Sequence, residues 1–254
     1  MALRSGFVKA AATLSLLAGM GISSSLVATA QGAFQANPVV LIVTLGALAL
    51  APFALIMMTS FVKISVVLSI LRNALGTQQV PPNQVITGIS LILTIFIMAP
   101  VAEKMLEEAG LSDATAPVFT EMRADTLFKA LDKGKEPLRT FLERNAHEAD
   151  RRLFLGLAQR LAQKNGKDPN AITVRDFRVV VPAFVTSQLT EAFQIGFLLF
   201  IPFLVIDMLV SNILQAMGMF MLSPTMISLP FKLLLFVLVK GWVTLIQNLV
   251  LSYA

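Results

Sequence analysis

The chain contains no cysteine and only one histidine, His147, among its 254 residues. Without cysteine, disulfide bonds, thiolate catalysis and thiolate metal ligands are excluded. A single histidine leaves almost nothing from which to build a histidine metal site or a Ser-His-Asp triad, so we interpret His147 as an exposed helical residue. The sequence also lacks HExxH, GxSxG, Walker and GxGxxG motifs. We therefore expect no enzymatic activity, no cofactor and no metal.

Charge is also scarce. Charged residues make up 14% of the chain and hydrophobic residues 56%, whereas ordinary soluble domains are about 25% charged. Most of the charges lie between Glu103 and Arg178, where acidic and basic residues are interspersed and nearly balanced. No basic stripe interleaved with aromatics is present, so we expect no nucleic-acid partner. The composition predicts a membrane protein with one charged block between apolar blocks.

Residues 1–30 have the features of a secretory signal peptide. Arg4 and Lys9 precede an uncharged apolar run over 10–20, and Ala28-Thr-Ala30 fits the small-x-small cleavage pattern. We predict cleavage before Gln31; the alternative is an uncleaved first helix.

Residues 31–102 are predicted to form a first apolar helical hairpin. Val39–Met58 is long enough for about 30 Å of hydrocarbon, and Pro52 inside it predicts a kink. A turn is expected around Gly76, and Val85–Val101 is the expected return helix, ending near Pro100.

Residues 103–180 are predicted to be a small charged helical insert on the extracytoplasmic side. Lys63 and Arg72 lie toward the turn of the first hairpin, which the positive-inside rule places in the cytoplasm. The insert then lies on the opposite side of the membrane. Helices are expected over three segments: Thr126–Leu131, Pro137–Asn145 and Glu148–Lys164.

The last of these segments is amphipathic. Leu153, Leu157 and Leu161 repeat at four-residue spacing, with Phe154 and Ala158 beside them. This pattern predicts an apolar stripe that packs against neighbouring elements, opposite a charged face.

Residues 181–254 are predicted to form a second apolar hairpin. The run Val179–Leu214 exceeds the bilayer as an unbroken helix, so it either bends at Pro202 or does not simply span. A last helix is expected over Leu229–Leu251. The predicted fold class is all-α and membrane-associated, with two kinked helical hairpins flanking the insert.

Five charged residues stand in apolar surroundings, where a charge costs at least about 2.5–3.5 kcal/mol and should be paired or face water. We favour structural pairing, with Glu191 and Lys232 as the first pair to test. The alternative is a proton relay, for which only Glu191 and Asp207 qualify. The five residues are Lys63, Glu191, Asp207, Lys232 and Lys240.

Met217, Met219 and Met221 alternate in a segment without charge. Methionine fills irregular gaps, so plain core or loop packing is one interpretation. The other is a gasket, because flexible thioether side chains can close on themselves and also around a moving polypeptide. Gly218 would let the backbone approach a crowded axis.

Several segments together resemble the FliP/SctR family of flagellar and virulence type III export-gate proteins, over residues 38–251. The segments are Thr59-Ser-Phe-Val-Lys-Ile64, Leu71-Arg-Asn-Ala-Leu-Gly-Thr77, Pro81-Pro-Asn-Gln-Val85, Pro182-Ala-Phe-Val-Thr-Ser187, Ala192-Phe-Gln-Ile-Gly-Phe197, Ile201-Pro-Phe-Leu-Val-Ile-Asp207, Met217-Gly-Met219 and Ser228-Leu-Pro-Phe-Lys-Leu233.

The resemblance implies a pentamer in the bacterial inner membrane that joins FliQ/SctS-like and FliR/SctT-like subunits and passes unfolded proteins. It also implies that Met217, Met219 and Met221 form the closing gasket, with Phe220 where relatives often carry methionine. Relatives often have Asp-Gly-Trp where this chain has Lys240-Gly-Trp242, so an acidic partner at position 240 is not carried over.

The predicted function is a pore-forming subunit of the type III protein export gate. Ser211-Asn-Ile-Leu-Gln215 and Leu222-Ser-Pro-Thr225 resemble the SctR branch, whereas the signal peptide and the sizeable insert resemble the flagellar branch; SctR is slightly favoured. The alternative function is a secondary transporter or ion channel that uses Glu191 and Asp207 as a proton relay.

Overall fold

The computed structural model describes residues 46, 49, 50, 53, 56–77, 80–110 and 124–253, with side chains in the helix that begins at 124 described from 134 onward. The chain divides into two units, Met1–Ala54 and Leu55–Ala254. In the first, the four described residues are helical. The predicted signal peptide and the expected kink at Pro52 lie outside the described residues.

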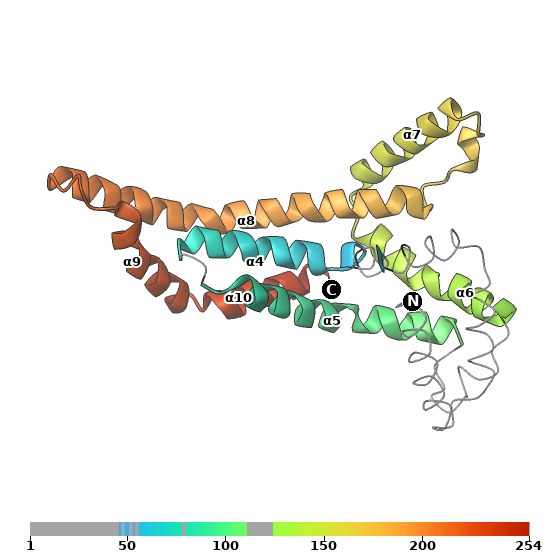
Figure 1. Ribbon diagram of the computed structural model, residues 1–254, viewed down its shortest axis with the longest axis horizontal. Coiled ribbons are helices and arrows are strands. Elements are labelled where there is room, and N and C mark those ends of the chain that lie inside the picture. Colours follow the sequence, from blue (N-terminus) through green and yellow to red (C-terminus); the bar gives the residue numbers. More distant parts are fainter. Residues whose placement is uncertain are drawn as a thin grey trace, which may run out of the picture. The chain divides into compact units, whose positions relative to one another are not determined.

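All elements described in the second unit are helices, which confirms the all-α part of the prediction (Figure 1). They are α4 (Phe61–Leu75), α5 (Asn83–Glu108), α6 (Ala124–Arg144), α7 (Glu148–Lys164), the 3₁₀ turn η1 (Pro169–Ala171), α8 (Phe177–Ala216), α9 (Pro224–Leu238) and α10 (Gly241–Leu251).

Helix α4 is the buried helix of this unit and packs against α5, α8 and α9. Its apolar residues recur every three or four positions and so form one face, which is the period of a helix that lies in a core. The buried set is Val62, Ile64, Val67, Leu68, Leu71, Ala74 and Leu75. The helix ends at Gly76, which takes a left-handed conformation (φ 73°) that glycine adopts at little cost.

Helices α4 and α8 run side by side in the same direction (Figure 1), and a glycine permits their close approach. A Cβ added at Gly196 of α8 would lie 2.4 Å from Cδ1 and 2.9 Å from Cγ2 of Ile70 on α4. A side chain at this position therefore cannot be accommodated unless the Ile70 side chain or one of the two helices shifts.

Helix α8 is continuous over 40 residues and contains both Pro182 and Pro202. At 1.5 Å per residue it is about 60 Å long, twice the hydrocarbon thickness of a bilayer. The helix is continuous through both prolines, and Figure 1 shows it gently curved. The helix is unbroken at Pro202, and it is too long for a simple upright span.

Two other prolines also lie inside helices where the sequence predicted an end or a start. Helix α5 continues through Pro100 to Glu108, past the expected end of the return helix, and α6 contains Pro137. A proline removes one backbone hydrogen bond and bends a helix, but packing on both sides can carry the helix through it. The segments expected at Thr126–Leu131 and Pro137–Asn145 are therefore parts of one helix.

Helix α7 has the predicted bounds, Glu148–Lys164. Its packing agrees with the prediction in part, because Phe154 and Ala158 of the predicted stripe, together with Leu155, pack against a cluster of Ala162, Ile172 and Val179. The predicted stripe residues Leu153, Leu157 and Leu161 are exposed. The two leucine-containing faces adjoin on the helix, so the sequence alone did not determine which of them packs.

The expected last helix, Leu229–Leu251, is broken into α9 and α10, whose axes differ by 59°. Lys240 at the break has φ 50° and ψ 45°, a left-handed conformation. Gly241 follows, and a Cβ there would lie 2.2 Å from the ring of Phe236. The close fold of α10 onto the Phe236 ring thus requires glycine.

Among the described residues, two helices are long and apolar enough to cross a membrane, α5 and α8, or three spans if the bent pair α9–α10 counts as one.

We predict that Gly196→Ala destabilises the protein by about 1–3 kcal/mol, because its Cβ overpacks the contact with Ile70. The measurement is thermal unfolding of the detergent-purified protein, followed by fluorescence of Trp242, the single tryptophan. Gly88→Ala in α5 is the control, since a Cβ there meets nothing within 4 Å. Equal melting temperatures for the two variants would contradict the prediction.

Candidate functional site

Lys63 of α4 is 1% exposed, and its ammonium lies 2.6 Å from Oε2 of Glu191 on α8. A buried ammonium without a counter-charge is strongly unfavourable, so this pair fixes where α4 meets α8. The ammonium also lies 4.5 Å from the ring centroid of Tyr253, a cation–π distance.

Glu191 also pairs with the single histidine. His147 Nε2 lies 2.9 Å from Oε1 of Glu191, and Nδ1 lies 3.7 Å from Oδ2 of Asp150. The backbone N–H of His147 donates to Oγ of Ser187 at 2.8 Å. His147 is exposed as predicted, but it precedes α7 at the N-cap position rather than lying within a helix. Glu191 therefore joins α4, α8 and the start of α7.

Tyr253, near the C-terminus, contacts the same group of residues around Glu191. The Tyr253 hydroxyl donates to Oε1 of Gln188, and Nε2 of Gln188 donates to the carbonyl oxygen of Asn145 at 2.9 Å. Burial, and then the negative charge of Glu191, raises the pKa of Tyr253 well above its usual range, so the hydroxyl keeps its proton and donates. The Tyr253 ring also stacks on Phe141 of α6, with centroids 5.9 Å apart.

The second buried lysine, Lys232 of α9, is 4% exposed. Its ammonium lies 2.6 Å from Oδ2 of Asp207 on α8 and donates to the carbonyl oxygen of Ala74, at the end of α4, at 3.2 Å. Ser228 of α9 donates to the other oxygen of Asp207. This pair joins α4, α8 and α9.

The expected pairing of Glu191 with Lys232 is therefore wrong within one chain. Glu191 and Asp207 are 16 positions apart on one continuous helix, a separation of about 24 Å along its axis. Each acid lies beside a different lysine, and the two pairs hold opposite ends of α4 on α8.

Lys240 differs from the other four charged residues in apolar surroundings, because its side chain is exposed. No described acidic residue forms a salt bridge with it. The expectation that Lys240 is a buried, paired charge is not met within one chain.

Helix α8 ends in a two-bond cap that starts the methionine loop, residues 217–223. The N–H of Gly218 donates to the carbonyl of Gln215, and the N–H of Met219 donates to that of Leu214. With Gly218 at φ 74°, this is the Schellman arrangement, which satisfies two terminal carbonyls and turns the chain sharply. Ser223 and Pro224 then start α9. The loop is therefore a short turn held between two helix ends.

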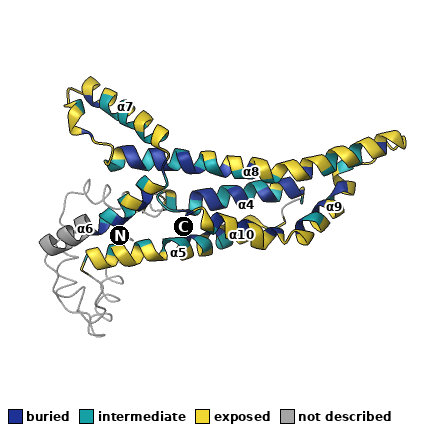
Figure 2. Ribbon diagram, turned by 180° about the vertical axis from the view of Figure 1, so that it is seen from behind, coloured by how far each residue is buried: buried dark blue, intermediate teal, exposed yellow. Residues whose placement is uncertain are grey.

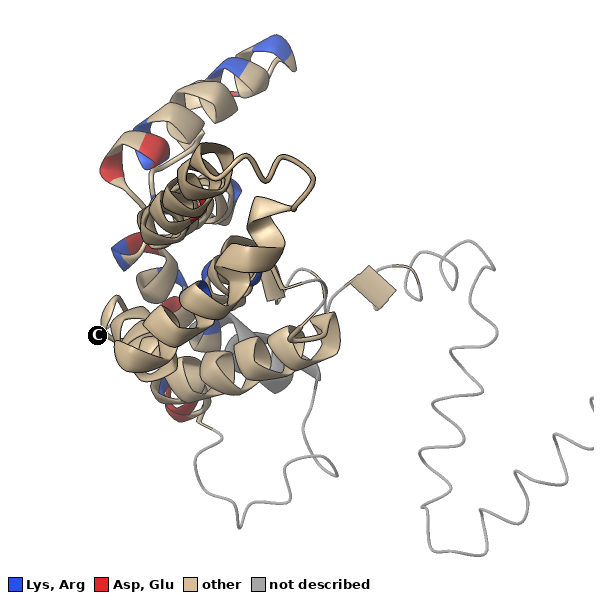
Figure 3. Ribbon diagram, turned by 90° about the vertical axis from the view of Figure 1, so that its left-hand side faces the viewer, with Lys and Arg blue, Asp and Glu red and all other residues tan. Residues whose placement is uncertain are grey.

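The loop carries only apolar side chains before Ser223, and they are exposed. Met221 is 99% exposed and Phe220 79%, and Met217 and Met219 are also exposed. Figure 2 shows exposed positions over the far half of α8 and around the loop, in contrast to the buried strip along α4. In Figure 3 the charged positions gather on α7, while the helices nearest the viewer are mostly uncharged. An apolar surface of this size marks a contact with lipid or with other chains.

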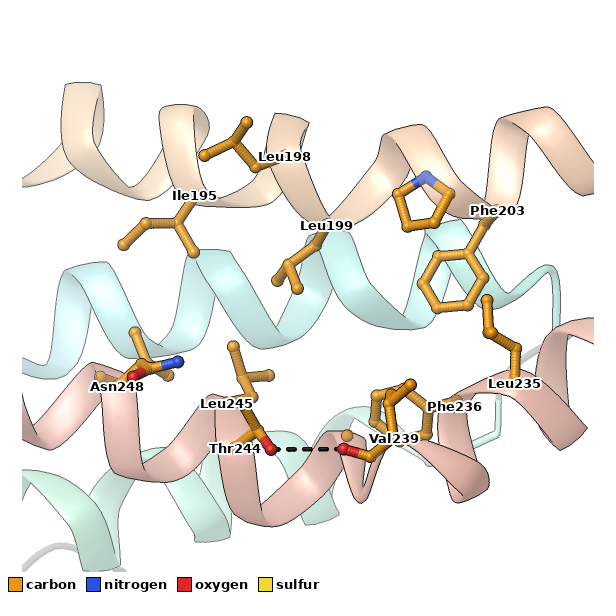
Figure 4. Close-up of a pocket in the computed structure, with 13 residues that line it drawn as sticks. Ile195, Leu198, Leu199, Phe203, Leu235, Phe236, Val239, Thr244, Leu245 and Asn248 are labelled. Carbon is orange, nitrogen blue, oxygen red and sulfur yellow. Dashed lines mark hydrogen bonds between the residues drawn. The ribbon is translucent and has the colours of Figure 1, made fainter.

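An apolar groove of about 520 Å³ lies between α8 and the bent pair α9–α10 (Figure 4). It is formed by α8 residues between Ile195 and Phe203 on one side and by Leu235, Phe236 and residues of α10 on the other. No group of three or more metal-ligating side chains occurs in the described part of the chain.

The FliP family model matches residues 44–249 of this chain. The flagellar biosynthetic protein FliP of Pectobacterium carotovorum is 48% identical over 84% of this chain and 77% of its own length. The Yop proteins translocation protein R of Yersinia pestis is 43% identical over 84% of this chain and 95% of its own length. A probable translocation protein of Sinorhizobium fredii is 45% identical over 82% of this chain and 90% of its own length.

The chain belongs to the FliP family. Members of this family are non-enzymatic components of the export gate of flagellar or virulence type III secretion, in the bacterial inner membrane. The predicted family is thus confirmed. Flagellar and virulence relatives have similar identity to this chain, so identity does not separate the two branches.

Three members of the Glu191 cluster in this FliP-family chain were missed by sequence reasoning: His147, Gln188 and Tyr253. Gln188 and Tyr253 are uncharged, so a search for charges in apolar runs passes over them. Gln188 could have been found from its spacing, because it lies one helical turn before Glu191 and therefore on the same face.

We predict that Asp207→Asn destabilises the protein by about 1–3 kcal/mol, less than a fully buried pair would lose because Asp207 is 30% exposed. The substitution leaves the Lys232 ammonium buried without a counter-charge. Adding Lys232→Met should recover part of the loss, and the double-mutant cycle should give a coupling of about 0.5–3 kcal/mol. Additive effects of the two substitutions in thermal unfolding would contradict the pairing.

Proposed function

We propose that copies of this chain surround a passage for unfolded proteins and that the methionine loop closes it. The observation that carries the proposal is the loop itself, with exposed methionine and phenylalanine side chains held on a capped turn at the end of a long helix. Unbranched thioether side chains adapt to irregular shapes, which suits a seal that must close and then admit different polypeptides.

The far half of α8 supports this arrangement. Its apolar side chains are exposed along with those of α9, and a second apolar pocket of about 380 Å³ lies between the two helices beside the loop. Copies arranged around an axis would cover these surfaces and bring their loops together. The resemblance implies a pentamer with FliQ/SctS-like and FliR/SctT-like subunits.

The proposed topology has two hairpins, α4–α5 and α8–α9–α10, with α6 and α7 in a periplasmic insert between them. The turn after α4 and the methionine loop then lie on the same side, because α4 and α8 run in the same direction (Figure 1). We propose the inner membrane as the location, within either a flagellar basal body or a virulence apparatus.

A proton relay through Glu191 and Asp207 is the competing function. Each of these acids lies 2.6 Å from the ammonium of a buried lysine. Both acids are therefore engaged in ion pairs that hold α4 and α9 on α8. The geometry therefore supports a structural role for both acids.

We predict that replacing Met217, Met219 and Met221 by alanine together makes cells leak ions and small solutes several-fold faster, while exported proteins still pass. Shorter side chains would leave the closed loops separated by water. The measurement is dye uptake or loss of membrane potential in cells that express the assembled gate. Met226→Ala is the matched control, since Met226 is exposed on α9 just beyond the loop. An unchanged seal in the triple variant would argue strongly against the gasket.

The proton relay and the structural role predict different effects of Glu191→Gln and Asp207→Asn. We expect both variants to lower the thermal stability of the complex, and export to fall only in proportion to the complex that remains. If export stopped while the complex stayed intact, closed and equally abundant, the relay would be supported instead.

A further inference from the structure

Lys240 has a left-handed backbone conformation, which lysine adopts at a cost. It is the only non-glycine residue with positive φ in the described part of the chain, at φ 50° and ψ 45°. Left-handed backbone brings Cβ too close to the following carbonyl oxygen, and only glycine, and to a lesser degree asparagine and aspartate, adopt it readily. Such an outlier is maintained by its surroundings and is frequent at functional positions.

The surface around Lys240 is apolar. Val237, Leu238 and Val239 before it and Val243 after it are all more than half exposed. Two of its neighbours, Val239 and Gly241, line the groove of about 520 Å³ between α8 and α9–α10 (Figure 4). An exposed lysine without a salt bridge among the described residues thus lies in sequence between two residues that line the apolar groove.

We propose that this groove and Lys240 are the docking site for an apolar helix of a different protein chain, which places a carboxylate against the Lys240 ammonium. The apolar side chains would fill the groove between Ile195 and Phe203 of α8 and the side of α10. The carboxylate would fix the helix at one level, because an ion pair within an apolar interface is lost if the helices slide.

A second copy of this chain does not supply that carboxylate. Residues 1–102 contain no aspartate or glutamate, and after Arg178 the chain has only Glu191 and Asp207. Both of these already pair with buried lysines. The remaining acids belong to residues 103–178, and α6 and α7 lie toward the end of α8 opposite to α9 (Figure 1). The described acids of α6 and α7 therefore lie far along α8 from the level of Lys240.

A lipid headgroup fits the position less well. Lys240 lies 11 positions before the end of α10 and eight after Lys232, about 16 and 12 Å along the helices. If α9 and α10 form one span, Lys240 lies well inside the hydrocarbon and away from the phosphates. A carboxylate on a neighbouring helix can stand at any depth.

The inference rests on the proposed function, in which this chain assembles with other gate subunits. The test expresses the full chain with the other proteins of its own export apparatus, purifies the complex through a tag on this chain and weighs it by native mass spectrometry. The variants are Lys240→Arg, Lys240→Met and Lys240→Gly, with Lys164→Met as the control, since Lys164 is an exposed lysine on α7.

Lys240→Arg and the control should keep every chain of the complex. Lys240→Met and Lys240→Gly should lower the amount of one other chain at least about tenfold, the loss expected when one member of a desolvated charge pair is removed. Lys240→Gly also relieves the left-handed strain, so the ring of this chain alone should melt at a higher temperature while it loses the partner. That combination separates lost recognition from misfolding.

A photo-crosslinking residue at Val243, which is exposed beside the groove, should join this chain to the same partner. Exchange of that partner's carboxylate for lysine should restore binding to Lys240→Glu.

Three results would overturn the inference: unchanged composition in Lys240→Met, a crosslink between two copies of this chain, or a phospholipid adduct. None of them affects the seal test with the methionine variants, so docking and gating can fail separately.

Discussion

Two buried ammonium groups determine how this unit is assembled. Lys63 near the start of α4 meets Glu191, and Lys232 of α9 meets Asp207 while bonding the carbonyl of Ala74 near the end of α4. Each lysine is nearly inaccessible, so neither can exchange its partner for water without a large desolvation cost. The lateral packing of α4 on α8 is apolar, and the two pairs fix its register, because each lysine meets its acid at one level only.

This register explains why α8 stays straight enough to act as a single long element. A helix of 40 residues with two internal prolines would bend easily in isolation. Its first half is packed by α4, α6 and α7, and the second pair anchors it again at Asp207. Beyond Leu214 the helix ends at the methionine loop. The loop's position therefore depends on ion pairs remote from it.

The sequence predicted the helical class, the bounds of α7 and the family, because each depends on local patterns: apolar runs, caps and a set of short motifs. It failed where the answer depends on contacts between distant segments. The partner of Glu191 depends on α8 passing Pro202 unbroken, which shifts Asp207 rather than Glu191 to the level of Lys232. The break at Lys240 depends on the Phe236 ring lying against Gly241. Neither is visible in residue spacing.

The five charged residues of the apolar blocks fall into two groups, according to whether each has a partner of opposite charge within the chain. Four of the five residues form two pairs inside one chain and serve its register. Lys240 alone is exposed, strained and without an acidic neighbour among the described residues. An unpaired ammonium on an apolar surface is costly. The two ion pairs stabilise one chain, whereas we infer that Lys240 is paired by a neighbouring chain in the assembly.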